Sequence, residues 1–339
     1  MNPRASSFKT ALGALMTVPV IVIGVLMLGD IGGGGGNAPA VAAVAGANGG
    51  ANGGEDGATR RGTVKCAESG SYAGDYHSAG RMTASWSWSC TGTTRTLLAN
   101  GLPDHEVGVF PNAGNPNMIR AQEVSLSLPL FPVVAASVAR AGPMLPVGYS
   151  LAGVKFDPVT NGHCPGTAVG REDCSLDGPV GHWLIEALGQ SVFDFGVDAN
   201  NAHVQPSGAY HYHGMPEALL ARAGLSDKQP AMLLVGWASD GYPIYARYCY
   251  RRADDAGSGL KRCAGSYQIN PHSAPDRPST HWAPLGTFDG DHVYVAGSGD
   301  LDDCNGRTGV TPEFPHGTYY YILTDSYPYI GRCLKGKLS

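Results

Sequence analysis

The sequence predicts a β-rich fold, all-β or β-rich α+β, with mostly antiparallel strands, long Gly/Pro loops and a few short helices. Glycine (49 residues) and proline (24 residues) are abundant, and both residue types favour turns. Tyrosine (16) outnumbers phenylalanine (8), and aromatic residues favour strands. Several short segments also alternate apolar and polar residues with a period of two, which is typical of half-buried strands.

The clearest strand pattern runs from Met82 to Cys90. Met82 and every second residue up to Cys90 face one way, and the intervening Thr and Ser residues face the other. Val124, Leu126 and Leu128 repeat this alternation, and residues 319–323 are aromatic and β-branched. We expect a strand in each of these places. Helical signal is weak, because only residues 182–188 and 216–223 each favour about two turns.

The N-terminus has the layout of an export signal. Arg4 and Lys9 precede an uncharged run from Ala11 to Gly29, which is also just long enough to span a bilayer. We therefore interpret residues 1–30 as a cleaved signal or a retained membrane anchor. Both interpretations place the protein outside the cytoplasm, either secreted or anchored by this segment.

A linker and one folded domain follow this segment. Residues 31–62 consist mainly of Gly, Ala and Asn, which offer too little apolar surface to offset the entropy of ordering. We expect one β-rich domain over residues 63–335 and a short tail over residues 336–339.

The folded part contains eight cysteines, and no pair has the C-x-x-C spacing of a zinc or redox motif. Scattered cysteines in even number indicate disulfides formed in an oxidising compartment. Two pairings close short polar loops and two more follow from proximity along the chain. These four predicted disulfides are Cys164–Cys174, Cys249–Cys263, Cys66–Cys90 and Cys304–Cys333.

The charge pattern limits the partners. The net charge is −5 and charged residues make up 15% of the chain, whereas nucleic acids and anionic membranes require a basic surface. We expect no nucleic-acid partner, and membrane contact only through a retained N-terminal segment. The remaining partners are a small molecule or an extracellular surface component.

The side chains best suited to bind a metal lie in the segment Gly208-Ala-Tyr-His-Tyr-His-Gly214. On a strand, His211 and His213 point to one face, and Tyr210 and Tyr212 point to the other. Two imidazoles at this spacing are placed to bind one metal ion, and His203 would join them if residues 203–205 and 210–213 form a hairpin. Imidazole ligands favour copper or zinc over calcium or magnesium. The alternative interpretation is that these histidines are half-buried polar residues bonded to backbone or carboxylates.

Several segments together resemble one known family. The segment Asn201-Ala-His-Val-Gln-Pro-Ser-Gly-Ala-Tyr-His-Tyr-His-Gly214 is similar to the signature of the YHYH-domain family, whose activity is not settled. Five further blocks, in the same order along the chain, resemble family segments, so that the resemblance covers about residues 95–335. These blocks are Asn100–His105 with Phe110–Asn117, Ser239–Tyr245, Gly299–Gly306, Thr311–Thr318 and Pro328–Cys333. Asp303 and Gly331 depart from the family pattern, where Glu and Pro are expected.

The resemblance adds His105 as a fourth candidate ligand, because it lies in one of these blocks. Asp240, Tyr210 and Tyr212 are candidates for orienting the histidines from a second layer. Asp300, Asp302 and Asp303 together suggest a calcium-binding site, because calcium favours several carboxylate ligands. Their spacing does not fit an EF-hand, since Cys304 stands where an oxygen ligand would be needed, and we therefore expect an Asp-capped turn.

These observations lead to two hypotheses of function. In the first, the protein is an exported copper or zinc protein centred on His211 and His213, and a metalloenzyme if the ion keeps an open position for water or dioxygen. In the second, it is a non-enzymatic surface or glycan-binding module with exposed aromatic residues and structural histidines. No P-loop, dinucleotide fingerprint, H-E-x-x-H motif or complete nucleophile elbow points to another activity.

Overall fold

The computed structural model describes residues 65–142, 145–272 and 274–339. The predicted signal or anchor and the predicted linker lie outside these residues. The first strand begins at Ala67 and the last ends at Gly336. In the described part of the chain, no helix is long and apolar enough to cross a membrane.

An antiparallel sheet of four strands opens the fold. Its strands, in spatial order, are β1 (Ala67–Asp75), β2 (Arg81–Thr91), β3 (Thr94–Ala99) and β4 (Val124–Pro129). In β2, Ala84 and Trp88 are buried whereas Thr83, Ser85 and Ser89 are exposed. The predicted strands at 82–90 and 124–128 are therefore confirmed.

The central sheet has eight strands and carries the histidine motif. Its spatial order is β10 (Ala202–Val204), β11 (Tyr210–Tyr212), β7 (Lys155–Phe156), β6 (Gly148–Ser150), β12 (Leu233–Ala238), β13 (Pro243–Ala246), β19 (Thr318–Leu323) and β18 (Gly306–Gly309). Neighbouring strands are antiparallel except for β11 with β7 and β13 with β19. Strand β19 confirms the strand predicted at residues 319–323.

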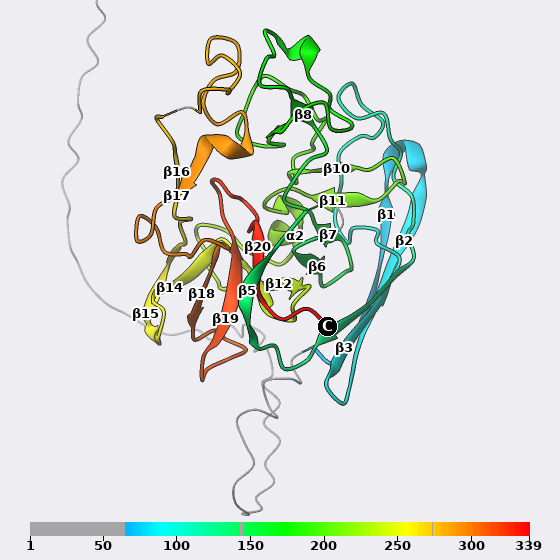
Figure 1. The fold of residues 1–339 in the computed structure, drawn as a ribbon. Helices are drawn as coiled ribbons and strands as arrows, with labels where there is room; N and C mark the ends of the chain where they lie inside the picture. The colour runs from blue at the N-terminus through cyan, green and yellow to red at the C-terminus, as the bar shows by residue number, and fades with distance from the viewer. Residues whose placement is uncertain (1–64, 143–144, 273) are drawn as a thin grey trace, which may run out of the picture. The chain divides into compact units, whose positions relative to one another are not determined.

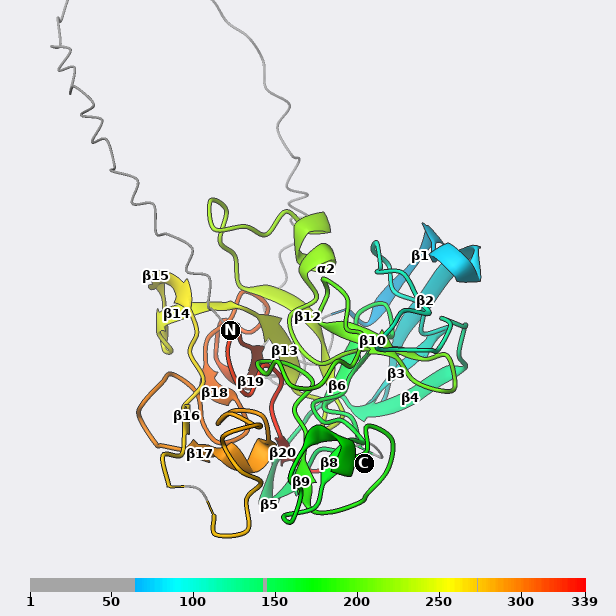
Figure 2. The same cartoon turned by 90° about the horizontal axis from the view of Figure 1, so that it is seen from above.

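Four pairs of short strands complete the β structure. They are β14 (Tyr248–Arg252) with β15 (Asp255–Arg262), β16 (Tyr267–Ile269) with β17 (His292–Tyr294), β20 (Cys333–Gly336) with β5 (Val134–Arg140), and β8 (His163–Cys164) with β9 (Trp183–Leu184). Figures 1 and 2 both place strands β1–β4 on one side of the central sheet and the β14–β17 pairs on the other. The β-rich, mostly antiparallel fold is thus confirmed.

Helices are few and short, as expected. Helix α2 (Glu217–Arg222) confirms the prediction at 216–223. The other helical segments are 3₁₀ turns: η1 (His77–Ala79), η2 (Arg171–Asp173) and η3 (Asp289–Asp291). The helix predicted at 182–188 is wrong, because Trp183 and Leu184 form β9 against β8. Trp183 packs into a small apolar cluster with Phe288, and this packing outweighs the weak preference of a two-turn helix.

All four predicted disulfides are present. The structure joins Cys66–Cys90, Cys164–Cys174, Cys249–Cys263 and Cys304–Cys333, and no cysteine in the described part of the chain is free. Disulfides persist in oxidising compartments and are rare in a reducing cytosol. The four bonds therefore indicate an extracytoplasmic location.

Candidate metal centre

The histidine motif lies on a hairpin formed by β10 and β11. These strands pair in antiparallel register, with His203 opposite His211 and Val204 opposite Tyr210. Residues directly opposite each other in such a pair point to the same face. The turn depends on Gly208, whose φ is +90° and whose added Cβ would lie 2.6 Å from the Cβ of Arg120. The hairpin on which the role of His203 depended is present, and it brings His203 to the face that carries His211.

Three imidazoles meet on this face. The ring centroids of His203 and His211 are 4.6 Å apart, and His213 lies 4.7 Å from each of them. The Nε2 atoms of His203 and His213 are 3.0 Å apart, and one ligand atom from each of the three residues lies within 4.8 Å of the others. Two nitrogens bound tetrahedrally to one zinc ion at its usual bond length are about 3.3 Å apart. The spacing therefore fits one ion shared by the three rings.

Backbone carbonyl groups set the orientation of two rings. A carbonyl oxygen only accepts, so Nδ1 of His203 donates to the oxygen of Phe195 at 2.8 Å and leaves its Nε2 as a lone pair. Nδ1 of His211 lies 3.3 Å from the oxygen of Ala209, which favours the same tautomer. This leaves the Nε2 lone pairs of both rings free to bind a cation.

His213 is the least satisfied of the three rings. It is only 3% exposed, and its Nδ1 has no hydrogen-bond partner among the described residues. Its Nε2 faces the Nε2 of His203, which already acts as an acceptor. Either tautomer of His213 thus leaves one ring nitrogen without a protein partner. A metal ion bound at Nε2 would take the place of the hydrogen bond to His203 and fix the ring proton on Nδ1.

Burial keeps the three rings neutral. Desolvation lowers the pKa of His203, and it lowers the pKa of His211 and His213 well below the usual value. The positive charge that His203 gains on protonation further lowers the pKa of both His211 and His213. Neutral imidazole is the form that binds a metal, so protons compete weakly for these nitrogens near pH 7.

The three histidines are among the residues that line a cavity of about 540 Å³. Its wall also contains Asp157, Asn115, Asn117, Phe195 and Gln205. Ligand-binding cavities are usually of this size and combine apolar walls with a few fixed polar groups. A ligand could therefore reach an ion held by the three rings.

Comparison with known proteins assigns the chain to a family. The model of the family described as YHYH protein matches residues 125–336. The chain belongs to the YHYH protein family. Searches among curated proteins and among solved structures gave no match. Tyr210-His-Tyr-His213 spells the family motif, and in this YHYH protein it supplies two of the three clustered imidazoles.

The structure does not bring His105 into the cluster. Its Nδ1 donates to the oxygen of Glu106 at 2.8 Å, and its Nε2 accepts a hydrogen bond of 2.6 Å from the hydroxyl of Tyr212. Tyr212 points to the face of β11 opposite His211, so His105 lies on the far side of the strand. The hydroxyl of Tyr210 likewise donates to Asp198 at 2.7 Å. The two tyrosines and His105 fix the strand and do not touch the clustered rings.

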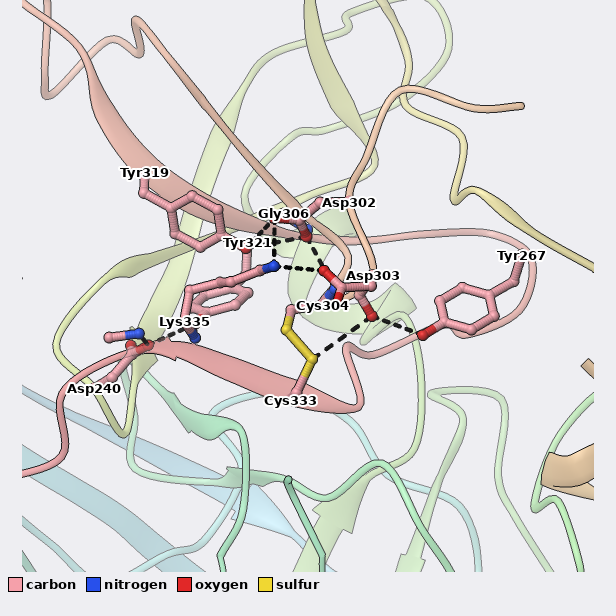
Figure 3. The surroundings of a disulfide bond; sticks show 11 residues. Asp240, Tyr267, Asp302, Asp303, Cys304, Gly306, Tyr319, Tyr321, Cys333 and Lys335 are labelled. Carbon is pink, nitrogen blue, oxygen red and sulfur yellow. Dashed lines mark hydrogen bonds and ion pairs between the residues drawn. A yellow bond between two sulfur atoms is a disulfide. The ribbon is translucent and has the colours of Figure 1, made fainter. Parts of the chain in front are cut away.

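Asp240 does not orient a histidine. Its Oδ2 accepts hydrogen bonds from the hydroxyl of Tyr321 at 2.5 Å and the amide of Gly336 at 2.8 Å, and its Oδ1 accepts from the amide of Tyr242 at 3.2 Å. Figure 3 shows Asp240 beside Tyr321, near the last strand. This fully buried carboxylate therefore fastens β20 to the central sheet.

The acidic segment at 300–303 forms a braced turn, as expected. Oδ1 of Asp302 accepts from the amides of Cys304 and Gly306 at 2.9 and 3.1 Å. Lys335 pairs with Asp303, and Figure 3 shows these groups around the Cys304–Cys333 disulfide. Two further groups of potential ligands in the described chain contain cysteines, but these cysteines are oxidised and offer no thiolate.

Most residues of the cavity wall carry no motif that marks them in the sequence. Asn115 and Asn117 lie in a block that resembles the family, which was a usable signal, but nothing assigned them to the site. Both donate their side-chain amides to the oxygen of Val204, at 3.0 and 2.8 Å, and so attach the loop to β10. Asp157 carried no sequence signal, because it reaches the site only through the pairing of β7 with β11.

Proposed function

We propose that this YHYH protein is an exported metal-binding protein that holds one zinc or copper ion on His203, His211 and His213. The observation that carries the proposal is the clustering of three imidazoles, two buried and one half-buried, whose ligand atoms lie within 4.8 Å of one another. Imidazole nitrogen suits both ions, and neither is distinguished by three such ligands alone. The disulfides and the signal-like N-terminal segment support export, with the protein secreted or held by that segment.

We further propose that the ion has an open coordination position. Three protein ligands beside a cavity are typical of catalytic zinc sites, whereas structural zinc sites use four ligands. A bound zinc ion would supply Lewis-acid activation of water at this position, and a bound copper ion would supply redox chemistry toward dioxygen. The protein's own groups would hold the rings in place through the carbonyls of Phe195 and Ala209 and admit the substrate through the cavity.

The competing hypothesis of a surface module loses its main support. It rested on exposed tyrosine and tryptophan side chains. All 16 tyrosines and five tryptophans lie in the described part of the chain, and each is buried or half-buried. We therefore favour the metal-binding hypothesis.

The test is metal analysis of the purified full chain, before and after treatment with a chelator. We expect one zinc or copper ion per chain, and a rise in melting temperature when the same ion is added back. Replacing His211 or His213 by Ala should remove the ion, whereas replacing the exposed His272 should not. A wild-type protein that contains no metal, and gains no stability from zinc or copper, would show that the proposal is wrong.

A further inference from the structure

The cavity beside the histidines has a wall with a specific chemical character. Among the described residues, its lining contains no lysine or arginine, whereas Asp157, Asp177, Asn115, Asn117 and Gln205 supply carboxylate and amide groups. A cavity for phosphate or carboxylate ligands needs cationic side chains or a cluster of free backbone amides. The wall is instead rich in groups that accept hydrogen bonds.

Asp157 is the central acceptor of this wall. It is 2% exposed, and its Oδ2 accepts a hydrogen bond of 3.3 Å from Nε2 of Gln205. Its Oδ1 has no hydrogen-bond partner among the described residues. Oδ1 is enclosed by protein atoms, so a hydroxyl group in the cavity would donate to Oδ2, which accepts one hydrogen bond and has a further lone pair.

The charge of Asp157 is already balanced inside the protein. Nζ of Lys155 lies 3.7 Å from the carboxylate and donates to Oε1 of Gln205 at 2.6 Å. A cationic ligand would therefore find no uncompensated buried charge, because Lys155 already neutralises the carboxylate. Asp177, the other acidic residue of the lining, is exposed and binds Asn161. These features favour a ligand that carries many hydrogen-bond donors and no net charge.

The loop that carries Asn115 and Asn117 adds further acceptors to the wall. The amide nitrogens of Asn115 and Asn117 are both bound to the oxygen of Val204, so their orientation is fixed. The oxygen of Asn117 has no partner among the described residues and remains available to a hydroxyl group. Val159, Leu176 and Phe195 give the same cavity an apolar surface. A compound with hydroxyl groups at its edge and C–H groups on its face matches both kinds of wall.

We propose that this cavity binds an uncharged polyhydroxylated ligand of mono- or disaccharide size, whose hydroxyl groups donate to Asp157 and Asn117. The inference concerns the wall of the cavity and does not require the ion. Binding is therefore measured on the full chain after metal removal, so that failure of one proposal leaves the other testable.

The experiment compares sugars that share a ring and differ in charge. The probes are glucose, galactose and mannose, their uronic acids, glucosamine and the disaccharide cellobiose, and binding is followed by saturation-transfer NMR. At least one neutral sugar should bind saturably, with its uronate weaker by about tenfold or more, as expected for an anion near an acceptor-rich wall. Glucosamine should bind no more tightly than glucose, because Lys155 already balances the carboxylate.

Variants of the wall test whether the sugar binds in this cavity. Asp157→Asn should weaken the neutral sugar by about fivefold or more, since an amide replaces one acceptor oxygen by a donor. Asp254→Asn is the matched control, because the side chain of Asp254 is 89% exposed and remote from the lining. Asn117→Lys should raise uronate affinity, and this gain remains measurable if the Asp157 variant fails to fold. Uronates that bind as tightly as neutral sugars, equal binding in all variants, or no binding of any probe would overturn the inference.

Discussion

The histidine cluster and the acidic turn at residues 300–306 both resemble metal sites in the sequence, but they differ in how their polar atoms are satisfied. In the acidic turn, Asp302 accepts from two backbone amides and Asp303 pairs with Lys335. In the histidine cluster, Nε2 of His203 faces Nε2 of His213, and a second nitrogen of His213 has no partner. In the turn only Oδ1 of Asn305 lacks a partner among the described residues, whereas the carboxylates that could bind an ion are already occupied. The two regions therefore differ in whether their potential ligand atoms are already bound, which residue composition does not show.

The largest expected effect is a difference in metal content between a variant of the histidine cluster and a variant of the acidic turn. His213→Ala should lower metal affinity by more than the roughly 10–100-fold caused by loss of an outer-layer contact, because it removes a ligand itself. Asp302→Ala should leave metal content unchanged and reduce only the melting temperature. Elemental analysis and thermal unfolding of both variants measure this. Metal loss in Asp302→Ala with retention in His213→Ala would reverse our assignment of the two regions.

The next effect concerns the bond that braces the acidic turn. Replacing Cys304 and Cys333 by Ser opens a loop with a sequence separation of 29 residues. Chain entropy then predicts a loss of about 3–4 kcal/mol in the free energy of unfolding. Urea unfolding of the oxidised wild type and the double variant checks this value. Stability equal to that of the wild type would show that Asp302, Asp303 and Lys335 hold the turn without the disulfide.

The pH dependence of stability tests whether the clustered rings are neutral when buried. Burial lowers the folded-state pKa of His211 and His213, so the unfolded chain binds more protons as the pH falls below about 6.5. Metal-free protein should therefore lose up to about 1.4 kcal/mol per pH unit for each such histidine between about pH 6.5 and 5.

The control for this prediction is the variant His211→Gln, measured over the same pH range. Burial raises the pKa of Asp157 and Asp240, and these groups act in the opposite direction as the pH falls. The difference between wild type and variant isolates the histidine. A variant whose stability falls as steeply as that of the wild type would contradict the prediction.

The smallest effect is on the far face of β11. Tyr212→Phe removes a hydroxyl that donates to Nε2 of His105 at 2.6 Å and leaves a buried acceptor unpaired. We expect a loss of about 1–2 kcal/mol in stability and no change in metal content. Unfolding curves and metal analysis check the two parts separately. Loss of the ion in this variant would mean that strand rigidity, rather than the ligands alone, controls affinity.

Much of the fold was predictable because its signals are local. The alternation in β2 and the short cysteine loops gave a strand and two disulfides directly, and a turn between His203 and His211 predicted the hairpin. The segment at 182–188 was mispredicted because its conformation depends on packing of Trp183 against the distant Phe288. The place of Asp157 in the cavity and the place of His105 outside the cluster could not be predicted for the same reason. Long-range packing of strands and loops decides which face of β11 each residue contacts.

All three proposed ligands come from one hairpin, within residues 203–213. Few contacts distant in sequence are needed to bring the imidazoles together, since the turn at Gly208 sets their register. Loop closure over so short a span is fast compared with the formation of the eight-stranded sheet. The three proposed ligands can therefore come together while the rest of the chain is still unfolded. For the exported metal-binding protein that we propose, the ion would then be captured during folding and would not need a finished fold.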